Sequence, residues 1–163
     1  MNWITAEDIS HRIKNIIPKI QFTHVRPDRI FCFRSTGSTG RATARIWNLP
    51  RLWQQALNED PAYCLEVISE RFDKLSLKDQ DKVLIHELMH IPKNFSGALV
   101  THRNAHHRTF RHYHDQVDTL YKLYKQRLRW YYGFIKNLID YKHLLFRPKF
   151  GALSLLSLPS GIV

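Results

Sequence analysis

The segment Ser76–Pro92 constrains the fold more than any other stretch, because it has the features of one delimited amphipathic helix. Ser76 precedes Asp79 by three residues, a pattern in which a hydroxyl caps the first turn of a helix. The apolar run Val83–Ile85 then favours burial of one face, and Pro92 stops the helix. The pattern therefore predicts a helix of about 16 residues.

The last turns of this helix carry the sequence His86-Glu87-Leu88-Met89-His90, an H-E-x-x-H motif. Residues i and i+4 lie on one face of a helix, so two imidazoles at this spacing can bind one Zn²⁺ with a carboxylate beside it. Such a site combines a metal-activated water with a base that deprotonates it. The chain holds 10 His, so a chance match has to be weighed. The helix context favours His86 and His90 as metal ligands and Glu87 as the catalytic base.

Spacing alone does not identify the third metal ligand. A catalytic zinc has three protein ligands and one position for water. Five histidines follow the motif helix, namely His102, His106, His107, His112 and His114. His102, His106 and Phe110 are four residues apart, so we expect them on the core-facing side of a helix and the other three histidines off that face.

The charge balance suggests a polyanionic partner. Lys and Arg number 25 against 14 Asp and Glu, which gives a formal net charge of +11. Basic residues are dense at Arg103–Arg111 and Lys122–Arg129, and the aromatic run Trp130–Tyr132 follows. The alternative function is therefore a nucleic-acid-associated zinc protein, catalytically inactive or with a structural metal. The acidic residue within the motif argues against a purely structural site.

Length and composition indicate one main domain in a reducing compartment. The chain has 163 residues, 44% of them hydrophobic, which suits a single domain with a real core. Cys32 and Cys64 are too few and too far apart for a disulfide framework. We expect no signal peptide, no transmembrane segment and a cytoplasmic location.

Hydrophobic periodicity predicts an α+β fold with about three strands. Two short strands, at 29–34 and 41–47, read as a hairpin around the turn signal Gly37–Gly40. The alternating run Tyr63–Ile68 reads as a third strand, and its place directly before the motif helix makes it a candidate edge for pairing with an extended peptide.

Helical patterns fill most of the remaining chain. Ile9, Ile13, Ile16 and Ile17 form a stripe that Pro18 ends, and Pro50 opens a short helix to about residue 57. The segment 91–101 reads as a loop. A helix is expected from about residue 103 to 128, and another over 130–145, broken by Gly133. Residues 127–163 are expected to form a helical extension and a poorly specified tail, which could bind a partner or a membrane surface.

Three stretches carry a family resemblance, at Tyr63–Leu75, Val83–Pro92 and Phe95–His102. The most specific part is H-E-L-x-H-I-P followed by F-S-G-x-L-x-x-H. These residues resemble the putative phage-type and prokaryotic metallopeptidase family, which is related to SprT-like zinc peptidases. The resemblance covers roughly residues 4–124, and we expect a metallopeptidase domain over residues 1–126.

The resemblance implies a zincin-like fold and a zinc-dependent peptidase that acts on proteins or peptides. The family position for the third zinc ligand matches His102. SprT-like proteins instead show a His four residues before an aromatic residue, which fits His106 and makes it the alternative ligand. Within this mechanism, His106 or Tyr113 could stabilise the oxyanion. A relation to SprT-like peptidases would make the two functions compatible, since those peptidases act on proteins attached to DNA.

Overall fold

The structure is a computed structural model that describes residues 1–101 and 110–142, with the backbone alone at 110–113. The chain divides into two compact units, residues 1–124 and 125–163. The predicted tail at 147–163 and the helical residues expected at 103–109 lie outside the described residues. Within the described ranges, no helix combines the length and the apolar character that crossing a membrane requires.

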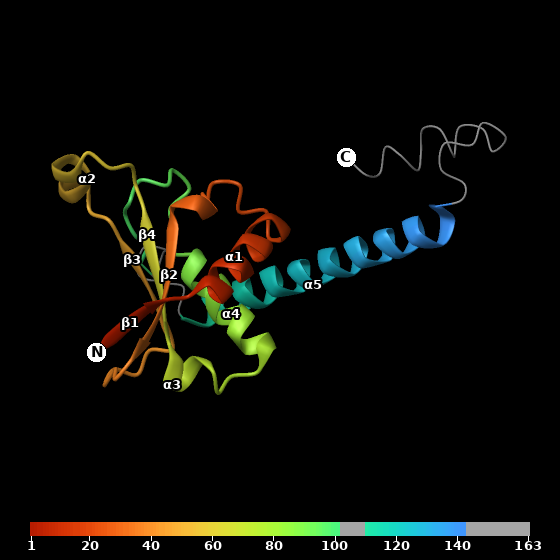
Figure 1. The fold of residues 1–163 in the computed structure, drawn as a ribbon, viewed down its shortest axis with the longest axis horizontal. Coiled ribbons are helices and arrows are strands. Elements are labelled where there is room, and N and C mark those ends of the chain that lie inside the picture. The colour runs from red at the N-terminus through yellow and green to blue at the C-terminus, as the bar shows by residue number, and fades with distance from the viewer. Residues whose placement is uncertain (102–109, 143–163) are drawn as a thin grey trace. The chain divides into compact units, whose positions relative to one another are not determined.

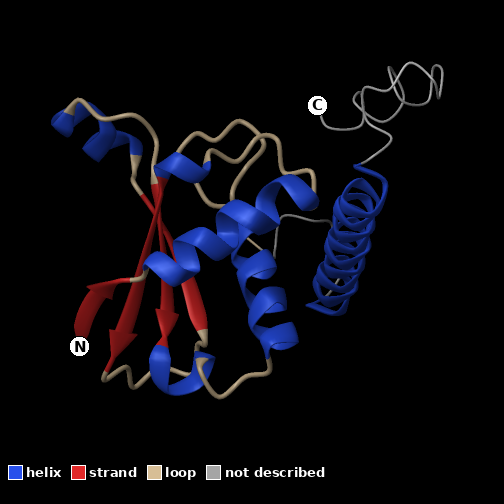
Figure 2. Cartoon of the chain, turned by 45° about the vertical axis from the view of Figure 1, so that its right-hand side comes forward, coloured by secondary structure: helices blue, strands red, loops and turns tan. Residues whose placement is uncertain are grey.

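The first unit contains a four-stranded mixed sheet, so the α+β class is confirmed, with one strand more than predicted (Figure 2). The strands are β1 (Asn2–Thr5), β2 (Ile30–Thr36), β3 (Ala44–Asn48) and β4 (Tyr63–Ile68). Their spatial order is β1-β2-β4-β3, in which β2 and β4 run parallel and the other two pairs antiparallel. The sequence pattern missed β1 because its four residues are all exposed and carry no burial signal.

The predicted hairpin of the first two strands is wrong, because β4 lies between β2 and β3. Ile30 to Ser35 of β2 pair with Tyr63 to Ile68 of β4, and β3 pairs with the other side of β4. The expectation that Tyr63–Ile68 is an edge is wrong for the same reason. Five of its six residues are buried, so the strand suits the centre of the sheet rather than its rim.

Two helices, α1 (Glu7–Lys19) and α4 (Leu77–Leu88), cover one face of this sheet (Figure 1). The predicted stripe of α1 is confirmed, since all four of its isoleucines are buried. Leu84, Ile85 and Leu88 of α4 are fully buried in the same core as Leu65 and Val67 of β4. The motif helix is thereby packed directly on the sheet.

Shorter helices connect these layers. The predicted helix after Pro50 is confirmed as α2 (Arg51–Leu57), and the helical turns η1 (Pro27–Arg29) and α3 (Ser69–Phe72) were not predicted. The last helix, α5 (Phe110–Tyr141), continues through Gly133, so the predicted break there is wrong. Glycine lowers helix stability by only about 1 kcal/mol, which a long helix tolerates.

The start of α5 belongs to the first unit. Val117 and Tyr124 are buried in its core. Lys82 of α4 forms an ion pair of 2.5 Å with Asp118. These contacts place the first turns of α5 beside the helix that carries the motif.

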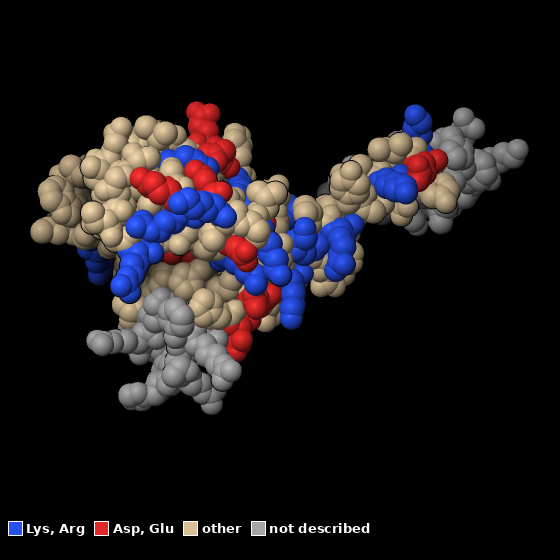
Figure 3. Space-filling view, turned by 90° about the horizontal axis from the view of Figure 1, so that it is seen from below, with Lys and Arg blue, Asp and Glu red and all other residues tan. Residues whose placement is uncertain are grey.

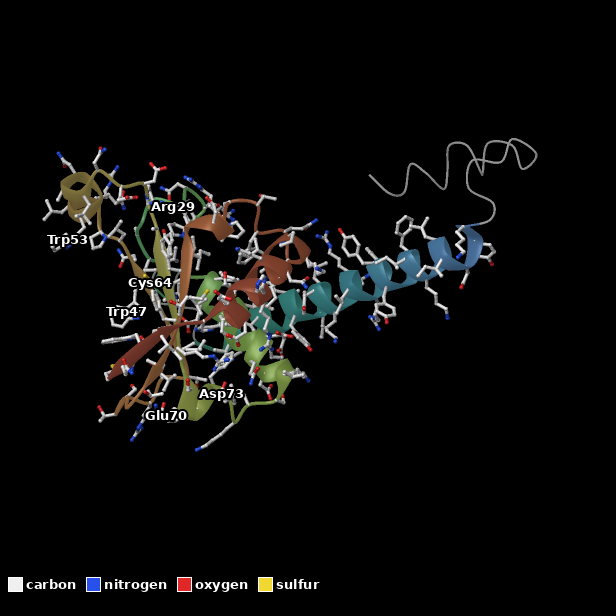
Figure 4. The ribbon with its side chains drawn as sticks, in the orientation of Figure 1. Arg29, Trp47, Trp53, Cys64, Glu70 and Asp73 are labelled. Carbon is white, nitrogen blue, oxygen red and sulfur yellow. The ribbon has the colours of Figure 1, made fainter. Side chains whose placement is uncertain are left out.

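The opposite face of the sheet carries a buried acid, Glu66 of β4. Its carboxylate accepts hydrogen bonds from Trp3 Nε1 of β1 at 3.2 Å and from Trp47 Nε1 of β3 at 2.8 Å, and Arg45 lies 3.7 Å away. The two indoles are themselves about half exposed, and Figure 4 shows Trp47 on the side of the sheet away from α1 and α4. Glu66 therefore ties both edge strands to the centre of the sheet.

Candidate metal centre

The start of α4 is held in place by a cap and by α1. Ser76 Oγ accepts a hydrogen bond from the backbone N–H of Asp79 at 3.2 Å, so the predicted cap is confirmed. Arg12 of α1 donates to Gln80 at 2.7 Å and approaches Asp81 to 2.8 Å. These interactions fix the direction in which the motif end of the helix points.

The helix ends earlier than predicted, after 12 residues at Leu88. Pro92 disfavours helical backbone at the residue before it, so the last turn tightens into i+3 hydrogen bonds. His90 N–H donates to Glu87 O at 3.2 Å, and Ile91 N–H donates to Leu88 O at 3.1 Å. His90 thus lies in a turn just beyond the helix.

His86 and His90 still face one another across this turn. Their ring centres are 5.2 Å apart and their planes are inclined by 77°. Zn–N bonds of 2.0–2.1 Å in tetrahedral geometry place two imidazole centres about 5 Å apart. The two side chains therefore fit a shared metal ion.

The loop after the motif orients His90. Its Nδ1 lies 2.7 Å from the carbonyl oxygen of Val100, and its backbone carbonyl accepts a hydrogen bond from Val100 N–H at 2.8 Å. A carbonyl oxygen only accepts, so Nδ1 carries a proton and Nε2 is the ring nitrogen at which a metal would bind.

This predicted loop, residues 91–101, is itself anchored to the sheet at Gly97. The residue has φ of 73°, and a Cβ there would lie 2.6 Å from Leu49 O. Tyr63 Oη accepts from Gly97 N–H at 3.0 Å, and Asn48 donates to Gly97 O at 2.8 Å. Only glycine allows this close approach, which explains its place between the motif and Val100.

Glu87 projects from α4 toward β3. Burial raises the pKa of its carboxyl, while the charge of His90 and a hydrogen bond from the backbone N–H of Ile46 act to lower it. A raised carboxyl pKa suits a group that accepts and returns a proton near neutral pH.

β3 is an edge strand of the described sheet. Thr43 O accepts a backbone hydrogen bond from Ile68 N–H of β4, and Leu49 N–H donates to Ala62 O just before β4. Ala44, Ile46 and Asn48 alternate with these residues, so they direct their backbone groups away from β4. No described strand pairs with that side. Glu87 therefore meets the outer edge of the described sheet.

Two clefts flank Glu87 along this edge. One, of about 390 Å³, is lined by β3, Glu87, His90 and the loop residues 99–101. The other, of about 630 Å³, is lined by residues 41–44, by His86 and Glu87, and by charged side chains of α4 and α5. Glu87 and Ala44 line both clefts, so the side chain of Glu87 is reached from either side.

Comparison with known families decides the relationship. The family model described as Putative phage metallopeptidase matches residues 1–126. The chain belongs to this family. The description of this family implies that its members bind a metal ion and act on a protein or peptide substrate. Neither the curated proteins nor the solved structures contain a match.

Both predicted candidates for a third metal ligand lie outside the residues that the structure places. His102 and His106 lie outside the described residues, as does the side chain of Tyr113. Within the described ranges, no three His, Cys, Asp or Glu side chains gather into a metal-binding group.

His114 was expected to lie off the core-facing side, and it is exposed, yet its ring centre lies 6.4 Å from that of His86. Sequence spacing did not indicate this proximity, because it depends on how α5 packs on α4.

Proposed function

We propose that the chain is a zinc-dependent peptidase in which Glu87 is the general base. The observation that carries this proposal is the meeting of three features at one place. His86 and His90 are paired at a metal-binding distance, the carboxylate of Glu87 lies beside them, and β3 lines the same clefts as these three side chains. The zincin-like fold and the relation to SprT-like peptidases are part of this proposal.

The metal ligands that we propose are His86, His90 and His102, with His106 as the alternative third ligand. The hydrogen bond between His90 Nδ1 and Val100 O supports His102 as the third ligand, since Val100 lies only two residues before His102 in the chain. Each residue extends the chain by at most about 3.6 Å, so two residues beyond Val100 keep position 102 close to His90. The resemblance to the family pattern supports the same choice.

A zinc ion held there would acidify a water molecule and polarise the scissile carbonyl. Glu87 accepts the proton of the attacking water at its carboxylate and then delivers it to the leaving amine nitrogen. A hydrogen bond from the backbone N–H of Ile46 would hold this carboxylate in place. His114 joins His106 and Tyr113 as a candidate for stabilising the oxyanion, because its ring lies beside that of His86.

The peptide substrate would add to the sheet along β3 rather than along Tyr63–Ile68, since β3 is the edge strand. Backbone groups of Ala44 point to that side and can pair with an extended peptide. The scissile bond would then lie beside Glu87, and the two clefts would receive side chains on either side of it.

The decisive experiment compares wild type with Glu87→Gln on an unfolded protein substrate in the presence of zinc. We expect the variant to lose activity by about 10²–10⁴-fold, because the proton transfer is lost, and to keep its bound zinc. Glu7→Gln, at an exposed carboxylate in the first turn of α1, is the matched control and should keep full activity. Equal cleavage by wild type and Glu87→Gln would refute the proposal.

The ligand assignment is tested separately by metal content. His102→Ala, His106→Ala and His114→Ala are purified and assayed for bound zinc alongside His86→Ala. We expect His102→Ala to lose zinc as His86→Ala does, and the other two to retain it. Loss in His106→Ala alone would move the third ligand to His106, and retention in all three would overturn the argument.

A further inference from the structure

The second unit exposes an unusual amount of apolar surface on the part of α5 that follows Tyr124. Six large apolar side chains of this segment are each more than half exposed, up to 78% for Tyr132. They are Trp130, Tyr131, Tyr132, Ile135, Ile139 and Tyr141. Exposed apolar side chains that are clustered, rather than scattered, mark a surface that binds something.

The apolar side chains of this segment, including the half-buried Leu128, recur with a helical period. Leu128, Tyr132, Ile135 and Ile139 follow one another at spacings of four, three and four, so they line one side of the helix. Trp130, Phe134 and Tyr141 recur at spacings of four and seven and form a second, aromatic row on another side of the helix, with Tyr131 between the two rows. We call the four residues of the first set the apolar stripe.

A basic stripe runs along the border of the apolar stripe. Lys125, Arg129 and Lys136 recur at spacings of four and seven, which places them together on the flank next to Tyr132. Between Lys125 and Lys142 the chain has five Lys or Arg and a single acid, Asp140. Figure 3 shows Lys and Arg side chains at the surface of this helix, with uncharged side chains between them.

We propose that this segment of α5 binds an anionic lipid surface, lying in the plane of the membrane. A helix with an apolar face, a basic flank and Trp and Tyr side chains matches the chemistry of a headgroup layer, which offers negative charge above hydrocarbon. The positive charge of the segment complements acidic headgroups. It also disfavours pairing with a second copy, whose segment carries the same charge.

The apolar stripe distinguishes lipid from nucleic acid. Phosphates attract the basic stripe, and bases stack on aromatic rings. Ile135 and Ile139 gain nothing from phosphates or from bases, whereas burial among lipid acyl chains would be favourable for them. A membrane is therefore the partner that uses both stripes.

The experiment is co-sedimentation of the full-length chain with vesicles of phosphatidylcholine alone or mixed with phosphatidylglycerol. We expect binding to the mixed vesicles only. Ile135→Gln/Ile139→Gln should weaken it by about tenfold or more, since glutamine keeps the helix but loses the apolar contact. Lys125→Glu/Lys136→Glu should weaken it by about tenfold or more through lost attraction to the headgroups.

The matched control is Lys14→Glu/Lys74→Glu, which makes the same change in net charge at exposed positions of the first unit and should bind as wild type does. Circular dichroism of each variant checks that the helix persists. The proposal is overturned if mixed vesicles bind no protein, or if the glutamine variant binds them as tightly as wild type. It is also overturned if the glutamine variant changes only self-association, or if the basic stripe binds DNA at low salt while vesicle binding is absent.

Discussion

At the scale of single residues, Glu66 shows how one buried charge organises the sheet. Burial raises the pKa of its carboxyl, but hydrogen bonds from Trp47 and Trp3 and the charge of Arg45 act against burial, and the pKa lies below its usual 4.5. The ionised form is therefore the one that the fold stabilises. Its two indole donors come from opposite edges of the sheet, so the charge links β1 and β3 through β4.

Glu66→Gln should lower the free energy of unfolding at pH 7 by about 1.5–3 kcal/mol, the range for hydrogen bonds to a charged group. A depressed folded-state pKa stabilises the protein above the unfolded pKa, and this contribution is lost as pH falls through the folded value. The difference between wild type and variant should therefore shrink below about pH 4.5. Urea unfolding at neutral and acidic pH measures it, and an equal difference at both would contradict the role of the charge.

At the scale of elements, α4 is positioned from both ends. Its start is capped by Ser76 and clamped by Arg12, and its last turn tightens before Pro92 so that His90 faces His86. The cap lies more than two turns from the motif. Its contribution is therefore to the stability of the helix rather than to the chemistry of the site.

Ser76→Ala should lower the free energy of unfolding by about 1 kcal/mol, because the first turn of α4 loses the acceptor for Asp79 N–H. Chemical denaturation followed by circular dichroism measures the change. Ser76→Asp restores an acceptor at the same position and should recover most of the loss. If alanine and aspartate behave alike, the cap does not stabilise the helix.

The edge strand β3 supports a prediction about substrate binding that rests on the proposed function. Ala44→Pro removes one outward-facing N–H without touching the bonds to β4, so the fold should persist. One lost hydrogen bond should lower kcat/KM for a long peptide by roughly two- to tenfold. Arg45→Pro is the contrasting variant, since it removes a bond to β4 and should destabilise the sheet. Unchanged kcat/KM in a folded Ala44→Pro protein would place the substrate elsewhere.

At the scale of the whole molecule, metal binding should stabilise the fold, because the paired histidines exist only when α4 and the following turn are formed. Zinc at a hundredfold excess over its Kd should raise the free energy of unfolding by about 2.7 kcal/mol. A chelator should reverse the gain, and His86→Ala/His90→Ala should abolish it. Thermal unfolding with and without zinc measures the effect, and a shift that survives in the double variant would mean that zinc binds elsewhere.

Much of the first unit could be predicted from local patterns. The isoleucine stripe of α1, the start of α4, the short helix α2 and the run that forms β4 all depend on residues within a few positions of one another. Capping, helical spacing and strand alternation act over that range. The loop with Gly97 was predicted for the same reason, although its anchoring to Asn48 and Tyr63 was not.

The strand order could not be predicted, because it depends on contacts between distant segments. Two apolar runs joined by a glycine-containing turn suggest a hairpin, but burial on both faces of β4 places it between them. The edge at which we propose that a peptide binds is therefore β3, and not β4 as predicted. The proximity of His114 to His86 depends in the same way on the packing of α5 against α4.

By itself, the sequence determined that two histidines and a glutamate come together at the end of one helix and the turn that follows it, since a spacing of four residues is a local property of the chain. Tertiary structure alone decided what surrounds them. The edge strand β3 meets Glu87, Val100 orients His90, and Gly97 lets the loop approach the sheet. Each of these contacts joins segments far apart in the chain, and only the packing of the sheet against α4 brings such segments together.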